Sequence, residues 1–208
     1  VSTGNLVSTV DYGEVIGADN GTFQDVGTDK VTSDYLYAVP ETGGDANLIG
    51  IIYQKTTKDY NNSKISEVKN YFDTLPLGKI SLGNVTREEN WISGTTYATI
   101  NRVFNNLGLP VSETDPLGHV TTYMYDSMNL YTVRVTNAAQ QVTSYEYDYR
   151  FGQVVKTIDP NGAISKISLD ALGRSVKEEY SDPAQTLPTS LFTKKIVSYD
   201  LYSQNGGV

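Results

Sequence analysis

Residues 114–135 read TDPLGHVTTYMYDSMNLYTVRV, residues 136–157 read TNAAQQVTSYEYDYRFGQVVKT, and residues 158–179 read IDPNGAISKISLDALGRSVKEE. The three segments align without gaps at a period of 22 residues. A fixed period of this length is typical of repeat architectures, in which each copy is one supersecondary unit that packs on its neighbours. The stretch therefore predicts a repeat array.

Each copy predicts a β-hairpin. In the first copy, Tyr123 and Tyr125 alternate with Thr122 and Met124, and the two later copies keep this alternation. A period of two places one aromatic or apolar row on one face of a sheet and a mostly polar row on the other. A turn and a short valine-rich strand follow in each copy. The expected fold class is all-β, with antiparallel hairpin repeats of about 22 residues that form an open, curved ribbon.

The turns that link the hairpins carry their own signature. The segments DPLG (115–118) and DPNG (159–162) place proline at the second turn position and glycine at the fourth. This order favours a type I turn in which the first aspartate accepts backbone N–H bonds. The predicted turn motif comprises Asp115, Pro116, Gly118, Asp159, Pro160 and Gly162.

A Tyr-Asp step marks the other end of each hairpin. The aspartate is expected to cap the tight turn that follows, and the neighbouring tyrosine is expected to pack on the sheet. The third copy has Leu169 in place of tyrosine, and it carries a Gly-Arg pair after the step. The predicted structural repeat motif comprises Tyr125, Asp126, Tyr147, Asp148, Leu169, Asp170, Gly173, Arg174, Tyr199 and Asp200.

Composition excludes several classes of function. The chain has 208 residues, a net charge of −8 and no cysteine, which rules out disulfides and thiolate chemistry. Scattered basic residues and an acidic balance disfavour a nucleic-acid partner. No apolar run approaches the roughly 18 residues that a membrane span needs, so membrane insertion by this segment is not expected. Sixteen tyrosines suit sheets that keep one face near water.

No residue predicts catalysis, a cofactor or a metal. His119 is the only histidine, so a histidine triad or a histidine metal site would have to use it, and its place after a turn favours a neutral role. The pair Glu88-Glu89 alternates across a strand and makes a poor acid–base pair. Asp19 and Asp25 faintly suggest a calcium loop, but they lack the EF-hand spacing. The sequence therefore predicts a protein that is not an enzyme.

The pattern continues outside the three best copies. Degenerate steps occur at 71–80 and at Phe104-Asn105, and Tyr199-Asp200 follows an insertion. These steps predict an array over 65–208, truncated at its C-terminal side, as expected of a piece of a longer chain. Residues 1–64 are expected to form a β-rich region that holds earlier, more degenerate repeats, with strands near 31–39 and 48–57.

The 22-residue period, the Tyr-Asp steps, the Gly-Arg at 173–174 and the Asp-Pro-x-Gly turns resemble the RHS or YD-repeat family. That family includes bacterial Rhs polymorphic toxins, the B and C components of insecticidal toxin complexes, and teneurins. The segment FDTLPLGKISLGNVTREENW (72–91) is similar to the region that introduces repeats in some bacterial members. The resemblance covers about 65–208. It implies a long β-ribbon that spirals into a hollow shell.

The resemblance implies a structural function in a large secreted or cell-surface protein. In this interpretation the segment contributes to a shell that encloses or presents a toxin domain. Its partners would be neighbouring repeats and an encapsulated C-terminal toxin domain. The alternative is a cell-surface adhesion module that binds glycan or protein through the repeat sheet. Open sheet edges also predict self-association of the isolated chain.

Overall fold

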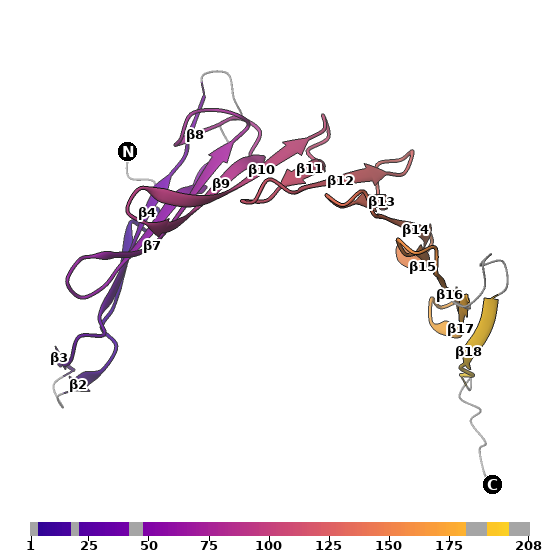
Figure 1. Ribbon diagram of the computed structural model, residues 1–208. Helices are drawn as coiled ribbons and strands as arrows, with labels where there is room; N and C mark the ends of the chain where they lie inside the picture. The colour runs from indigo at the N-terminus through magenta and orange to yellow at the C-terminus, as the bar shows by residue number, and fades with distance from the viewer. Residues whose placement is uncertain (1–3, 18–20, 42–47, 182–190, 200–208) are drawn as a thin grey trace, which may run out of the picture. The chain divides into compact units, whose positions relative to one another are not determined.

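The computed structural model describes residues 4–17, 21–41, 48–181 and 191–199. The chain forms two compact units, residues 1–120 and 121–208. The two units are defined by compactness, whereas the expected boundary between 1–64 and 65–208 was placed where the repeat motifs begin. That boundary therefore stays a prediction. Figure 1 shows that β-hairpins follow one another along the chain in each unit.

The first unit contains one main antiparallel sheet and two small strand pairs. The strands of the main sheet lie in the order β1, β4, β6, β7, β9, β10 and β11. Their bounds are Ser8–Asp11, Val31–Tyr37, Ile52–Lys58, Lys64–Phe72, Val85–Ser93, Thr96–Phe104 and Pro110–Thr114. β2 (Val15–Gly17) pairs with β3 (Phe23–Asp25), and β5 (Val39–Pro40) pairs in parallel with β8 (Lys79–Ile80).

The second unit is a succession of hairpins in which every strand pairs with the next strand along the chain, in the order β12 to β18. The strand bounds are Val120–Tyr125, Thr132–Thr136, Val142–Asp148, Gln153–Ile158, Ile164–Leu169, Ser175–Ser181 and Leu191–Ile196. β12, β14 and β16 begin 22 residues apart, as the sequence period requires. The predicted all-β fold of antiparallel hairpins in an open sheet is confirmed in each unit.

A β-bulge recurs at the same place in six of the hairpins. The register shifts between Met124 and Tyr125, and it shifts again one and two periods later, at Tyr147 and Leu169. In the first unit the same shift precedes Tyr37, Phe72 and Phe104. A bulge inserts one extra residue into one strand and turns its side chains. The hairpins β4–β6 and β7–β9 therefore share the local geometry of the later copies, although their sequences hardly show it.

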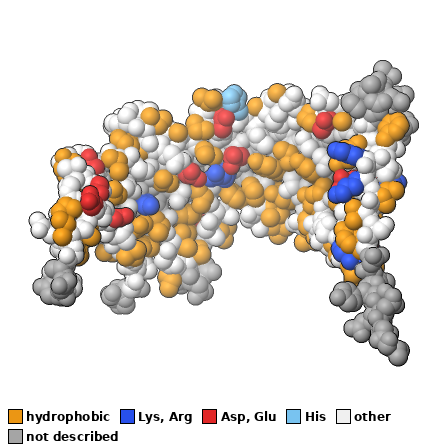
Figure 2. Space-filling view, turned by 90° about the horizontal axis from the view of Figure 1, so that it is seen from below, with side chains coloured by type: hydrophobic (Ala, Val, Ile, Leu, Met, Phe, Trp, Pro, Cys, Tyr) orange, Lys and Arg blue, Asp and Glu red, His pale blue; other side chains and the backbone are white. Residues whose placement is uncertain are grey.

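Only a small part of the described chain is buried. Among the described residues the buried apolar side chains are Ala38, Phe72 and Ile80, and they lie where β5 and β8 meet the main sheet. Elsewhere the sheet is a single layer, and many large apolar side chains remain at the surface (Figure 2). Backbone pairing between neighbouring strands, together with cross-strand side-chain contacts, therefore holds most of the fold together.

Candidate functional site: the repeat turns and a pocket on the first unit

Six turns of the described chain share one backbone geometry, and in five of them the first side chain also accepts two backbone N–H groups; in the sixth, which begins at Asn137, the side chain accepts that of Gln141. In the turn that begins at Asp159, the N–H of Gly162 donates to the backbone oxygen of Asp159 at 3.0 Å, and the N–H of Asp159 donates to that of Ala163 at 3.0 Å. The Asp159 carboxylate accepts from the N–H groups of Asn161 and Ala163, each at 2.8 Å. The first residues of the five turns are Asp59, Asn105, Asp115, Asp159 and Asp170.

The fourth residue of each such turn has a positive φ. Gly162 has a φ of 83°, a conformation that side-chain-bearing residues adopt rarely, and Asn62 occupies the equivalent position of the first turn at 63°. A type I turn followed by one left-handed residue is a common three-residue hairpin loop. In the Asp-Pro-x-Gly sequence, the aspartate accepts backbone N–H groups, the proline fixes φ at the second position, and the glycine can adopt the positive φ of the fourth position.

Hydrogen bonds lower the pKa of three turn aspartates, Asp115, Asp126 and Asp170. Hydrogen bonds from the His119 backbone and side chain lower the pKa of Asp115, and the backbone N–H of Arg174, followed by its side chain, lowers the pKa of Asp170. The side-chain bond from Tyr149 is the main cause of the lowered pKa of Asp126. Each carboxylate thus serves as a fixed acceptor within its turn, and no proton-transfer role follows from these positions.

The structure places the predicted repeat residues at the ends of hairpins. Tyr125, Tyr147 and Leu169 follow the bulge, and the aspartate after each begins the turn. The guanidinium of Arg174 pairs with Asp170 at 2.7 Å and lies 4.0 Å from the ring of Tyr199. The predicted residue Asp200 lies outside the described residues. These positions make the motif residues parts of turns, and their role as a structural repeat motif stays a prediction.

The His119 side chain forms a pair with the carboxylate of Asp115. Its Nδ1 lies 2.9 Å from Oδ2 of Asp115, and its side chain is 60% exposed. The pair belongs to the same turn. The suggested calcium loop lies partly outside the described residues, since Asp19 is not among them. In the described part of the chain, no group of three or more His, Cys, Asp or Glu side chains could hold a metal ion.

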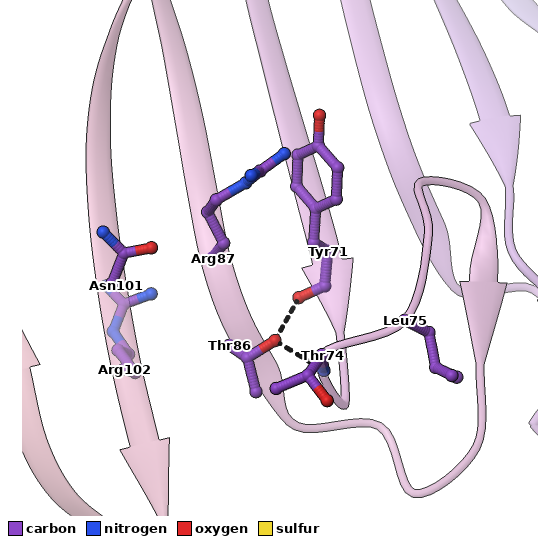
Figure 3. Close-up of a pocket in the computed structure, with 7 residues that line it drawn as sticks. All are labelled: Tyr71, Thr74, Leu75, Thr86, Arg87, Asn101 and Arg102. Atoms are coloured by element: carbon purple, nitrogen blue, oxygen red, sulfur yellow. Dashed lines mark hydrogen bonds between the residues drawn. The ribbon is translucent and has the colours of Figure 1, made fainter.

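A pocket that the sequence did not indicate lies over β7, β9 and β10. Its volume is about 350 Å³, and Tyr71, Arg87 and Asn101 contribute to its lining from three neighbouring strands (Figure 3). In the register Arg87 is opposite Tyr71 on one side and Asn101 on the other. The hydroxyl of Thr86 donates to the Tyr71 carbonyl at 3.2 Å and accepts from the Thr74 N–H at 2.9 Å, which fixes the adjacent turn.

A buried carboxylate lies on the same face of the first unit. Glu67 is only 7% exposed and accepts hydrogen bonds from Tyr97, Thr56 and Lys64. Burial by itself raises the pKa of Glu67, but these bonds and the charge of Lys69 outweigh it and lower the pKa to about 2. The ammonium of Lys69 also lies 4.3 Å from the Tyr97 ring centre. With each partner supplied by the chain itself, this cluster is a cross-strand structural network.

The structure comparison relates this architecture to solved toxin complexes. A crystal structure of TcdB2-TccC3 matches with a TM-score of 0.60 at 13% identity, over 74% of this chain and 11% of that chain. A crystal structure of TcdB2-TccC3-Cdc42 matches with a TM-score of 0.59 at 14% identity, over 74% and 11%. A structure of the Photorhabdus luminescens Tc holotoxin pore gives 0.55 at 14% identity, over 73% and 10%. No protein-family profile matches the sequence, and no curated protein does.

The similarity to these structures is a similarity of fold. The chain spans about a tenth of the length of these toxin-complex chains, with identities of 13–14%. At that level the comparison confirms the relationship in fold to RHS-containing Tc toxins that the repeat motifs indicate. Within the described residues, no helix is both long and apolar enough to cross a membrane.

Proposed function

We propose that the chain is a structural segment of a large secreted or cell-surface RHS/YD-repeat protein, and that it forms part of a shell that encloses a toxin or effector domain. The observation that carries the proposal is the repeated bulged hairpin with its aspartate-capped turn, in the fold that Tc-toxin structures share. A hairpin of this kind is a building unit, because each copy satisfies its neighbour's strand edge.

The site chemistry agrees with a structural role. The turn carboxylates are engaged by backbone N–H groups, and His119 is paired within its own turn. A nucleophile–base–orienter arrangement, which hydrolytic catalysis requires, does not occur around His119 in the described part of the chain. We therefore assign no reaction to these residues. The partners proposed for the segment are the preceding and following repeats and an enclosed polypeptide.

Electron microscopy and limited proteolysis on the longer protein that contains this segment test the proposal. The expected result is a hollow particle whose enclosed domain survives protease while the shell is intact and is degraded once the shell is opened by denaturant. A particle without a cavity, or a C-terminal domain that is cut at the same rate in both conditions, would overturn the enclosure. Selective binding of the isolated chain to glycans in a screen would instead support the adhesion interpretation.

A further inference from the structure

We infer that Tyr131 and Tyr147 form a site of oxidative modification, at which a one-electron oxidant joins their two rings through a dityrosine bond. The bond links consecutive hairpins of the second unit. The inference is independent of the shell role proposed above. It rests on three observations: the stacking of the two rings, the state of their hydroxyls, and the residues that replace them in the next repeat.

The strand register places the two tyrosines opposite one another. In the pairing of β13 with β14, Arg134 is opposite Ser144. The same register, continued from Arg134 back to Tyr131, places Tyr131 opposite Tyr147. Their ring centres are 4.5 Å apart and their planes differ by 11°, so the rings are stacked. The backbone of two paired strands, and not the side chains alone, therefore holds the rings together.

Stacked rings are well placed for radical coupling. A tyrosyl radical carries part of its unpaired electron in p orbitals of the ring carbons next to the C–O carbon. These orbitals point out of the ring plane, and in a stacked pair they point toward the other ring. A bond between two such carbons of Tyr131 and Tyr147 therefore needs only a small displacement of either side chain.

A third tyrosine nearby lacks this geometry. Tyr149 meets Tyr131 edge-on, with ring centres 5.5 Å apart and an angle of 68° between the planes. Its hydroxyl donates to Oδ2 of Asp126 at 2.5 Å, which holds the ring in that orientation. The hydroxyls of Tyr131 and Tyr147, in contrast, have no hydrogen-bond partner among the described residues. Both side chains are half-buried, so their phenols can release a proton to water.

The reaction balances with a peroxide as the final oxidant. Each phenol gives one electron to the oxidised haem of a peroxidase and its hydroxyl proton to water, which leaves two tyrosyl radicals. The radicals form one carbon–carbon bond. Each joined carbon then loses its hydrogen as a proton and each oxygen takes up a proton, so both rings become phenols again. The pair has lost two hydrogen atoms, and one molecule of hydrogen peroxide has become two of water.

The repeat itself does not require two tyrosines at these positions. One period later the equivalent residues are Gln153 and Leu169, and that repeat forms the same bulged hairpin. The stacked pair is therefore a feature of one junction between hairpins. Since the chain has no cysteine, a covalent link between hairpins must come from other side chains. A bond from Tyr131 to Tyr147 closes a loop in the chain and so restricts the unfolded state, as a disulfide does.

Peroxidase treatment of the full 208-residue chain tests the inference. The folded chain is exposed to a haem peroxidase and limiting hydrogen peroxide at low protein concentration, and the monomeric product is digested with trypsin. Cleavage after Arg134 and Arg150 leaves the two tyrosines in separate peptides, 103–134 and 135–150. We expect dityrosine fluorescence and a joined pair of these peptides that lacks two hydrogen atoms. Fragmentation of the joined pair should place the bond between Tyr131 and Tyr147.

Four variants make the test specific. Y131F and Y147F should each abolish the joined peptides, because phenylalanine keeps the ring and removes the phenol. Having two such variants guards against misfolding of either one, which far-UV circular dichroism detects. Y149F should still give the joined peptides, since Tyr149 meets Tyr131 edge-on. Y60F is the matched control, because Tyr60 is 46% exposed and lies in the first unit.

Three outcomes would overturn the inference. The first is an unchanged yield of joined peptides in a folded Y131F or Y147F chain. The second is a bond that fragmentation places at Tyr149, with its loss in Y149F. The third is oxidation of Tyr60 and other exposed tyrosines under conditions in which the joined peptides do not form.

Discussion

A Cβ atom placed on Gly173 would lie 2.8 Å from Cδ1 of Phe151, a residue of the preceding hairpin turn. One repeat earlier, the same construction at Gly152 meets the hydroxyl of Tyr131 at 2.9 Å. The turn that contains Tyr131 therefore places its ring against Gly152 of the next hairpin, and the turn that contains Phe151 places its ring against Gly173. The glycine is required twice, once for its positive φ and once for the room that the ring occupies.

Gly173→Ala should destabilise the chain more than Gly162→Ala does. Both glycines have similar φ values, 77° and 83°, but a Cβ at Gly162 meets nothing within 4 Å. The left-handed conformation alone should lower the free energy of unfolding by about 1 kcal/mol in each variant. Displacement of the Phe151 ring should add about 1–3 kcal/mol in Gly173→Ala. Urea denaturation measures both values, and equal losses would show that the ring contact is unimportant.

Asp73→Ala should unfold the enlarged turn between β7 and β9. The Asp73 carboxylate accepts four backbone N–H groups, from Ser81 and the three residues after it, at 2.7–2.9 Å. Burial tends to raise the pKa of Asp73, but these bonds lower it. Since several donors lose their acceptor at once, we expect a loss of at least about 2 kcal/mol. Amide hydrogen exchange at 81–84 should rise.

The control for this turn is Asp73→Asn, which keeps one acceptor oxygen and removes the charge. Its free energy of unfolding and its amide hydrogen exchange rate at 81–84 should lie between those of the wild-type chain and of Asp73→Ala. If the two variants exchange at the same rate as the wild type, other contacts hold the turn.

Stability should decline in acid below pH 4.5. The pKa of Glu67 is lowered from 4.5 to about 2 in the folded chain, so the unfolded state binds the proton more readily. The stability that ionised Glu67 contributes is complete above about pH 4.5 and is lost as the pH falls toward 2. Asp73, whose pKa is also lowered, adds to the same trend. Chemical denaturation between pH 2 and 7 should show this loss.

Glu67→Gln tests the origin of the acid sensitivity. The variant should lose about 2 kcal/mol at neutral pH and give a flatter profile in acid, because the group no longer titrates. Glu146→Gln is the matched control, since Glu146 is 62% exposed and bonded only to Lys156 among the described residues. A profile for Glu67→Gln as steep as that of the wild type would assign the acid transition to other groups.

Self-association should depend on the edge strand β18. Among the described residues this strand is the last in its sheet, and it exposes Phe192 and Ile196 by 53% and 73%. An uncovered edge offers N–H and C=O groups to another chain, and charged side chains oppose such pairing. The double variant F192K/I196K should therefore reduce concentration-dependent growth in sedimentation velocity. L172K, a change at a turn residue that is 67% exposed, should leave it unchanged.

The second unit was predictable because the short turn and strand motifs and the 22-residue period indicate the same strands. The 22-residue period, the Tyr-Asp step within each hairpin and the Asp-Pro-x-Gly turn between hairpins agree on where the strands end, so the strands from β12 to β17 follow the expected pattern. Pairing there joins strands that are adjacent in sequence, and the alternation of Tyr145 and Tyr147 with polar residues fixes which face each side chain takes.

The pocket of the first unit was not predictable for a physical reason. Tyr71, Arg87 and Asn101 lie about 15 residues apart, and only the register of β7, β9 and β10 brings them into one row. That register depends on the bulge before Phe72 and on the length of the turn after it. The sequence did signal this segment through its Tyr-Asp-like step at 71–80. It carried no signal that distinguishes a side chain in a pocket from one on an open strand.

The parallel bridge between β5 and β8 has a mechanical consequence. It joins the turn after β4 to the turn after β7, so a pulling force that opens one of these hairpins must also break the bridge and expose Ile80. The hairpins from β12 to β17 lack such a bridge in the described chain and can detach one at a time. Each 22-residue copy would release about 75 Å of extended chain. A stretched molecule should therefore yield in evenly spaced steps from its second unit, while the first unit gives way in one larger event.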